Sequence, residues 1–232
     1  GAVQKFSPTG TLLLTINLGD YSNDVAVDSS GNIYVTPVGW PETVTKFSSS
    51  GNSLMTWDTQ GSTTGVAIDS SGNVYVANTG SLIQKFGPSG NLILSFGSTG
   101  TGDGEFKSPK RIALDNSGNI YVTDFHNDRV QKFDSSGNYL MTITGNLTEP
   151  KGVTVDNNGN IYVADESAGS VQQFSSTGTA GWTTTFQAGS NPQDVAVDNS
   201  GNAYIAYSNT VERHDHGSGD GNFYGFYTHC SF

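Results

Sequence analysis

Apolar and polar residues follow one pattern five times along the chain. A short apolar run leads into an acidic turn with Gly and Asn, and a second apolar run with a tyrosine follows. Apolar runs bounded by such turns predict short β-strands. The Asp side chain can bond the turn's backbone amides while Gly adopts a positive φ, so each copy predicts a β-hairpin. The copies are VAVDSSGNIYV at 25–35, VAIDSSGNVYV at 66–76, IALDNSGNIYV at 112–122, VTVDNNGNIYV at 153–163 and VAVDNSGNAYI at 195–205.

A second phrase recurs six times and extends each hairpin to four strands. It predicts an alternating third strand, and an apolar run behind a further Gly turn predicts the fourth. The hairpins lie 41, 46, 41 and 42 residues apart, a period typical of propeller blades. We predict an all-β propeller in one domain, residues 1–232, with repeats near 25–57, 66–97, 112–144, 153–186 and 195–227 and a half-blade at 1–18. The second phrase reads VQKF at 3–6, VTKF at 44–47, IQKF at 83–86, VQKF at 130–133, VQQF at 171–174 and VERH at 211–214.

The number of blades stays open, because 232 residues lie between five and six repeats. We expect six blades, one of them incomplete or closed by the other terminus, with 222–227 as the last strand of the fifth. In the alternative, the N-terminal strand pair completes a five-bladed ring and 207–232 form a C-terminal tail. In a third possibility the half-blade pairs with another molecule by strand addition, which would give an oligomer or a filament.

Composition narrows the classes of partner. The net charge is −11 and the ten Lys and Arg residues are scattered, which argues against nucleic-acid binding. Cys230 is the single cysteine, so neither a disulfide framework nor a cysteine-rich metal or haem site is expected. No apolar run reaches the roughly 18 residues of a membrane-spanning helix, and we predict no membrane insertion.

The third copy carries the most distinctive combination of motifs. It holds Gly-Asp-Gly-Glu-Phe, Pro109, the hairpin phrase, Asp124-x-x-Asn127-x-Arg129 and Val-Gln-Lys-Phe. This combination resembles NHL repeats, and the resemblance extends in partial form from residue 1 to about 214, with Asn78 in place of the Asp. It implies a propeller, commonly six-bladed, used for protein, glycan or RNA recognition, and in one branch for zinc-dependent lysis of hydroxyglycine peptides.

The loops between second and third strands and between blades vary while the opposite turns repeat, and such loops commonly carry binding groups. They bring aromatic rings beside carboxylates and amides, which suits a sugar or peptide ligand. In the competing interpretation Trp40 packs on its neighbouring prolines and Trp182 packs between blades. The candidate ligand-binding residues are Tyr21, Trp40, Glu42, Phe125, His126, Asp128, Asp165 and Glu166.

Metal binding is a second possibility. The C-terminal residues His214, His216, His229 and Cys230 have the side chains of a transition-metal site. Because they all come from one segment of the chain, a solvated C-terminal tail is the favoured interpretation. Each Asp-x-x-Gly-Asn turn offers one carboxylate where a calcium loop needs several. We therefore interpret the turns as structural and predict no cofactor, with zinc, or calcium on axial backbone carbonyls, as the alternative.

The function that fits these features is a non-catalytic binding or assembly module for protein, peptide or glycan. Asp-rich, Ser/Thr/Asn/Gly-rich loops and the sequon Asn146-Leu-Thr148, a candidate glycosylation site, favour an extracellular or cell-surface protein in mature or trimmed form. Two alternatives stay open. One is a filament subunit joined through the half-blade, and the other is a metal-dependent propeller lyase or hydrolase.

Overall fold

The computed structural model describes residues 1–7, 9–19, 21–38, 42–185, 191–208, 210–216 and 223–226. The chain forms two compact units, Gly1–Thr99 and Gly100–Phe232. The described elements are β-strands and one short 3-10 helix. None of the described helical structure has the length and apolarity needed to cross a bilayer.

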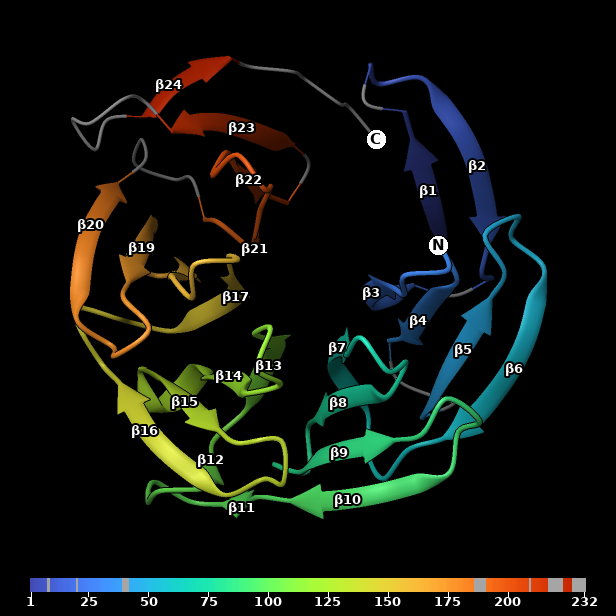
Figure 1. Ribbon diagram of the computed structural model, residues 1–232, viewed down its shortest axis with the longest axis horizontal. Helices are drawn as coiled ribbons and strands as arrows, with labels where there is room; N and C mark the ends of the chain where they lie inside the picture. The colour runs from blue at the N-terminus through green and yellow to red at the C-terminus, as the bar shows by residue number, and fades with distance from the viewer. Residues whose placement is uncertain are drawn as a thin grey trace. The chain divides into compact units, whose positions relative to one another are not determined.

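The first unit contains a two-stranded sheet and two four-stranded blades (Figure 1). The two-stranded sheet is β1 (Ala2–Phe6) and β2 (Leu12–Asn17). Blade 1 is β3 (Ser22–Val27), β4 (Ile33–Pro37), β5 (Thr43–Phe47) and β6 (Ser53–Asp58). Blade 2 is β7 (Thr63–Ile68), β8 (Val74–Asn78), β9 (Ile83–Phe86) and β10 (Leu92–Phe96), and β11 (Ser98–Thr99) ends the unit.

The second unit begins with the short β12 (Glu105–Phe106) and contains three blades. Blade 3 is β13 (Pro109–Leu114), β14 (Ile120–Asp124), β15 (Arg129–Phe133) and β16 (Tyr139–Ile143), with the 3-10 helix η1 (Phe125–Asn127) between β14 and β15. Blade 4 is β17 (Pro150–Val155), β18 (Ile161–Asp165), β19 (Ser170–Phe174) and β20 (Ala180–Thr185). Blade 5 is β21 (Asp194–Val197), β22 (Ala203–Ala206), β23 (Val211–His216) and β24 (Phe223–Phe226).

Every blade is an antiparallel sheet whose strands follow chain order. The all-β propeller of four-stranded blades is thereby confirmed. The described residues form five complete blades. The prediction of six blades is therefore wrong, and the blade number of the five-bladed alternative is confirmed. The physical reason is that a blade needs its own hairpin. The strand at 3–6 has no such hairpin among the described residues and pairs with β2 alone.

The five-bladed alternative also predicted a C-terminal tail at 207–232, and this part of it is wrong. Residues 211–216 and 223–226 are the third and fourth strands of blade 5 and not a tail, with Arg213 opposite Phe226. β23 in turn pairs with β22, with Val211 opposite Ala206. Blade 5 therefore takes all four strands from its own repeat, and β1 and β2 contribute none of them.

The repeated Asp turn has the same geometry in all five blades, and blade 3 shows it. Asp115 Oδ1 accepts the amides of Ser117 and Asn119, each at 2.9 Å. Its Oδ2 accepts Asn119 Nδ2 at 2.7 Å and the Tyr121 hydroxyl at 3.0 Å. Gly118 has φ +80°, which a side chain rarely tolerates. Both carboxylate oxygens are thus occupied by donors of the turn, in agreement with a structural role.

The core lies between successive blades of a unit. In the first unit, Tyr34 and Trp57 of blade 1 pack against Val66 and Phe86 of blade 2. The Trp57 ring centroid lies 6.2 Å from those of both Tyr34 and Phe86. In the second unit the tyrosine at the same repeat position, Tyr121 or Tyr162, packs against the next blade. The repeated spacing of the hairpin therefore supplies one large buried ring per interface.

Candidate functional site

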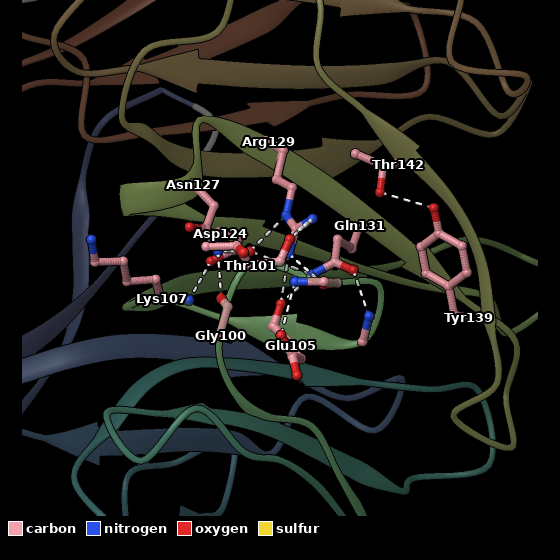
Figure 2. Close-up of polar contacts among 12 residues, drawn as sticks. Gly100, Thr101, Glu105, Lys107, Asp124, Asn127, Arg129, Gln131, Tyr139 and Thr142 are labelled. Carbon is pink, nitrogen blue, oxygen red and sulfur yellow. Dashed lines mark hydrogen bonds and ion pairs between the residues drawn. The ribbon is translucent and has the colours of Figure 1, made fainter.

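The signature Asp124-x-x-Asn127-x-Arg129 forms a buried polar centre in blade 3 (Figure 2). Arg129 Nε lies 2.8 Å from Asp124 Oδ2, and Asp124 is fully buried. Asn127 Nδ2 donates to the same carboxylate oxygen at 2.8 Å. Asp124 Oδ1 accepts the Lys107 amide at 2.6 Å. This carboxylate ties the end of β14 to the segment that precedes β13.

The guanidinium of Arg129 holds the loop at 100–107 in place. Its Nη1 donates to the Thr101 carbonyl at 2.9 Å, and Nη2 donates to the carbonyls of Gly102 and Glu105 at 2.8 Å each. Gln131 Nε2 donates to the Glu105 carbonyl at 2.7 Å (Figure 2). Because all these groups bond one another, we assign this centre to structure and not to ligand binding.

Blade 4 keeps the carboxylate of this centre but not the cation. Asp165 occupies the position of Asp124, and Ser170 that of Arg129. Asp165 is fully buried, and burial raises the pKa of its carboxyl. The nearby carboxylates of Asp128 and Glu149 raise it further, against the amides of Ala168 and Thr148, which lower it. The Ser170 hydroxyl has no hydrogen-bond partner among the described residues.

A cluster of lysines lies where the first strands of blades 3, 4 and 5 begin. The lysine cluster consists of Lys110, Lys151, Glu166, Gln193 and Phe125. Lys151 Nζ lies 3.2 Å from Glu166 Oε1 and also donates to Gln193 Oε1. Gln193 Nε2 donates to the same Glu166 oxygen at 2.8 Å. Partial burial opposes ionisation of Glu166, but these bonds hold its pKa below the usual value. The Glu166 carboxylate thus bonds both Lys151 and Gln193.

Lys110 is the less compensated cation of the cluster. Burial lowers the pKa of its ammonium, and the charges of Lys151 and Arg111 lower it further, while Glu166 opposes them. Its Nζ lies 5.1 Å from the Phe125 ring centroid. Among the described residues no carboxylate is within ion-pair distance of Lys110. An anion arriving here would meet a half-buried ammonium flanked by an aromatic ring.

Arg111 extends the positive side of this region across blade 4. Its Nε donates to Asp194 Oδ2 of blade 5 at 3.0 Å. Gly152 of blade 4 makes the approach possible, because a Cβ at this position would lie 2.6 Å from the Asp194 Cα. The ion pair and the glycine together fix the first strands of the three blades at the cluster.

Two of the predicted binding residues lie in the cluster and one beside it. Phe125 and Glu166 are members, and His126 stacks edge-on to Phe125 with ring centroids 4.9 Å apart. Two other predicted residues, Asp128 and Asp165, do not offer a free carboxylate to a ligand at the cluster. Asp128 Oδ1 accepts the Glu149 amide at 2.9 Å, and Asp165 is buried as described.

The predicted residues of the first unit lie in a different place. Tyr21 is 78% exposed and lines a pocket of about 190 Å³ with Leu18, Val35 and Phe47. Glu42 Oε2 accepts the Gly61 amide at 3.0 Å, so it stabilises a turn. The structure therefore does not unite the predicted residues into one site.

Five predicted residues belong to the part of the chain whose side chains are not described. Trp40, His229 and Cys230 lie outside the described residues, and so do the side chains of His214 and His216 in β23. In the part of the chain that is described, no group of three or more His, Cys, Asp or Glu side chains could hold a metal ion. The metal site and the enzymatic alternative stay predictions. Asn146 is exposed, as a glycosylation site requires.

The lysines were not among the predicted site residues, although the sequence holds a signal for them. Lys110, Lys151 and Gln193 lie 41 and 42 residues apart, at one position of three successive repeats. Each follows a proline at the start of the first strand. The repeat period together with the preceding proline therefore marks this position in the sequence.

Comparison with known proteins identifies the repeats. A family model described as NHL repeat matches residues 106–133 and 147–174, and one described as Beta-propeller repeat matches residues 10–36. Two segments of the chain, in blades 3 and 4, therefore match NHL repeats. The two NHL segments carry the Asp124–Arg129 centre and its blade 4 counterpart. Protein lin-41 of Caenorhabditis elegans is 48% identical over 48 residues, which are 21% of this chain and 4% of lin-41.

Solved structures share the fold of this chain. A streptogramin B lyase structure has a TM-score of 0.79 at 13% identity and covers 99% of this chain and 77% of its own. A catalytically inactive virginiamycin B lyase from Staphylococcus aureus, with quinupristin, has a TM-score of 0.76 at 11% identity, covering 97% and 76%. A Bacteroides caccae protein has a TM-score of 0.71 at 17% identity, covering 89% and 83%. Identities this low establish the fold and nothing about a reaction.

Proposed function

We propose that this chain is a non-catalytic module that binds a protein or peptide through an acidic group at the lysine cluster. NHL propellers generally mediate protein interactions, which supports this class of function. The observation that carries the proposal is the state of Lys110. Its ammonium is half-buried, repelled by Lys151 and Arg111, and packed on Phe125. A carboxylate bound beside it would relieve that repulsion.

The chemistry of the cluster favours a carboxylate on a peptide over a nucleic acid. Glu166 pairs with Lys151 and only partly offsets the charge of Lys110, so the cluster offers one cation that has no ion pair among the described residues and not a track for a chain of phosphates. Phe125 and His126 beside Lys110 supply apolar and stacking surface. A peptide that presents an acidic side chain next to an apolar one fits this combination. Glycans stay a weaker candidate because the uncompensated group is a cation.

The test is calorimetric titration with tetra-aspartate that has blocked termini, against tetra-asparagine as the uncharged probe. Lys110→Ala should weaken tetra-aspartate binding roughly 10- to 150-fold, the worth of a charge-assisted hydrogen bond. Lys5→Ala, which removes the same charge from the exposed Lys5 of β1, should leave it unchanged. Equal binding of both probes, or no effect of Lys110→Ala, would overturn the proposal.

We also propose that the protein works outside the cell. The exposed Asn146 in Asn146-Leu-Thr148 supports this, because the acceptor amide of a glycosylation site must reach the modifying enzyme. Expression through a glycosylating secretory pathway should add a glycan mass that enzymatic deglycosylation and Asn146→Gln both remove. Secretion of an unmodified chain would contradict the assignment of this site.

A further inference from the structure

The third strand of a blade carries a cation opposite the hairpin tyrosine, and blade 4 is the exception. Strand pairing sets Lys132 opposite Tyr121 in blade 3, whereas Gln173 lies opposite Tyr162 in blade 4. Blade 4 therefore keeps the tyrosine of the repeat, and also the turn carboxylate Asp156, but lacks the cation. The cations of the other four blades are Lys46, Lys85, Lys132 and Arg213, opposite Tyr34, Tyr75, Tyr121 and Tyr204.

The blades that keep a lysine show where its ammonium lies. In blades 1 and 2 the lysine Nζ lies 5.0 Å and 4.9 Å from the tyrosine ring centroid. The same Nζ atoms lie 3.9 Å from Asp28 Oδ2 and 4.0 Å from Asp69 Oδ2. In blade 3, Lys132 Nζ lies 5.0 Å from the Tyr121 ring centroid and donates to the Ser176 carbonyl of blade 4 at 3.5 Å. The ammonium thus lies at the end of the blade that carries the Asp turn.

A pocket of about 220 Å³ opens between the Asp turns of blades 4 and 5, where this cation is missing. We name it the blade 4–5 pocket. Asp156 of one turn and Asp198 of the other line it, and so does Gln173. Tyr162 also lines it, although its side chain is only 2% exposed, so the carboxylates are more accessible to a ligand than the ring face. One water takes about 30 Å³ in the liquid, so an ammonium with an alkyl stem has room here.

The equivalent pocket between the turns of blades 3 and 4 contains its own cation. This blade 3–4 pocket has a volume of about 300 Å³, and Asp115, Asp156 and Lys132 line it. Gln173 takes the place of Lys132 in the blade 4–5 pocket. Two carboxylates therefore share a pocket with one ammonium between blades 3 and 4. Between blades 4 and 5, two carboxylates share a pocket in which the described lining includes no lysine or arginine.

Hydrogen bonds hold the walls of the blade 4–5 pocket in place. Asn157 Nδ2 of one turn donates to Asn199 Oδ1 of the other at 2.9 Å, which links the two turns. Asp156 Oδ1 accepts the backbone amides of Asn158 and Asn160 at 2.8 Å and 2.9 Å. These donors are neutral, so they position the carboxylate without cancelling its charge. A cationic ligand would therefore meet a pre-formed site, which lowers the entropic cost of binding.

We propose that the blade 4–5 pocket binds a primary ammonium on an unbranched alkyl stem, presented as a lysine side chain by another polypeptide. The ammonium lies between Asp156 and Asp198, as the ammonium of Lys132 lies in the blade 3–4 pocket. Hydrogen bonds between charged partners are about twice as strong as neutral ones, and the net charge of −11 attracts a cationic partner. The pocket shares no residue with the lysine cluster, so the two proposals stand or fall separately.

The experiment titrates the full chain with lysine that is acetylated at Nα and carries a methylamide at its carboxyl end. We expect saturable one-to-one shifts of the NMR amide signals of residues 156–160 and 198–201. The same probe acetylated at Nε has no charge and should bind at least about 10-fold more weakly. Gln173→Lys supplies a cation from within and should abolish binding while circular dichroism stays unchanged. Gln4→Lys, the same change at an exposed residue of β1, is the matched control and should leave binding unchanged.

A second variant tests whether the missing cation is what opens the site. Lys132→Gln gives the blade 3–4 pocket the side chain of the blade 4–5 pocket, so it should raise the number of bound probes from one to two. The new shifts should fall on residues 115–119. Lys132→Arg keeps a cation and should leave the number at one.

Four outcomes would overturn the proposal. They are equal binding of the two probes, binding that survives Gln173→Lys, a single site in Lys132→Gln, and no binding to the wild-type chain. A further probe, n-butylammonium, has the same ammonium and stem without a backbone. If it bound more tightly than the blocked lysine, the pocket would be a site for a free amine and the assignment to a lysine of another polypeptide would be wrong.

Discussion

Replacing Arg129 by methionine tests how the NHL signature holds the blade 3 loop. The substitution keeps a long apolar stem and removes the guanidinium. Asp124 then stays buried without its cation, and the carbonyls of Thr101, Gly102 and Glu105 lose their donor. Removing one partner of a buried ion pair costs about 3–5 kcal/mol. Asp124 keeps three other donors, the Lys107 amide and the side-chain amides of Asn127 and Gln131, so we expect a loss of about 3 kcal/mol, at the lower end of that range.

Unfolding in guanidinium chloride, followed by circular dichroism, would measure the loss of unfolding free energy. Hydrogen exchange of the peptide covering 100–107 would locate it, because the Lys107 amide is bonded to the same carboxylate. Adding Asp124→Asn to Arg129→Met removes the buried carboxylate charge that has lost its cation. The double variant should recover at least about 1 kcal/mol of unfolding free energy. The matched control is Lys132→Met, which removes a cation from the same strand outside this centre. Because Lys132 Nζ lies 5.0 Å from the Tyr121 ring centroid, this variant should lose no more than about 1 kcal/mol. A loss below about 1 kcal/mol for Arg129→Met, or unchanged exchange at 100–107, would refute the reasoning.

Three further predictions concern blade 4. Gly152→Ala should cost about 1–3 kcal/mol in unfolding free energy, because the added Cβ would overlap the Asp194 backbone. The raised pKa of Asp165 means that its contribution is favourable at low pH and is lost as pH rises above the ordinary carboxyl value of 3.8. Unfolding curves at several pH values should therefore show wild type losing stability relative to Asp165→Asn across that window; parallel curves would contradict this. Gln173→Lys should add about 0.5–1 kcal/mol by placing an ammonium over Tyr162, and Gln173→Met should not; the same change should lower the Tyr162 pKa from about 12.

The hairpins, turns and blade type were predictable because their causes are local. Asp115, Gly118, Asn119 and Tyr121 bond within seven residues of sequence. The period of about 42 residues then decides the architecture. The number of complete blades was not predictable in the same way. It depends on whether the strand at 3–6 finds a hairpin, which is a long-range property.

The site was predicted only in part for a related reason. Phe125 and Glu166 were identified from loop chemistry, and both lie in the lysine cluster. Lys110 and Lys151 were missed because they begin first strands in different blades and meet only when those blades pack. Asp165 was read as a loop carboxylate, but it is the last residue of β18 and is buried. A side chain at the end of a strand can be buried or can be exposed in the adjoining loop, and its position in the sequence does not decide between the two.

In a repeat protein the identical positions explain the fold, and the departures from identity show where function can lie. The Asp turn is the same in every blade and its carboxylate bonds donors of its own turn, so its presence is explained without a ligand. Lys110 and Lys151 depart from the Asn23 and Thr64 that hold their position in blades 1 and 2. The two lysines bring positive charge to this end of blades 3 and 4, and the ammonium of Lys110 lies half-buried beside the Phe125 ring. This departure therefore defines the chemistry of what would bind there.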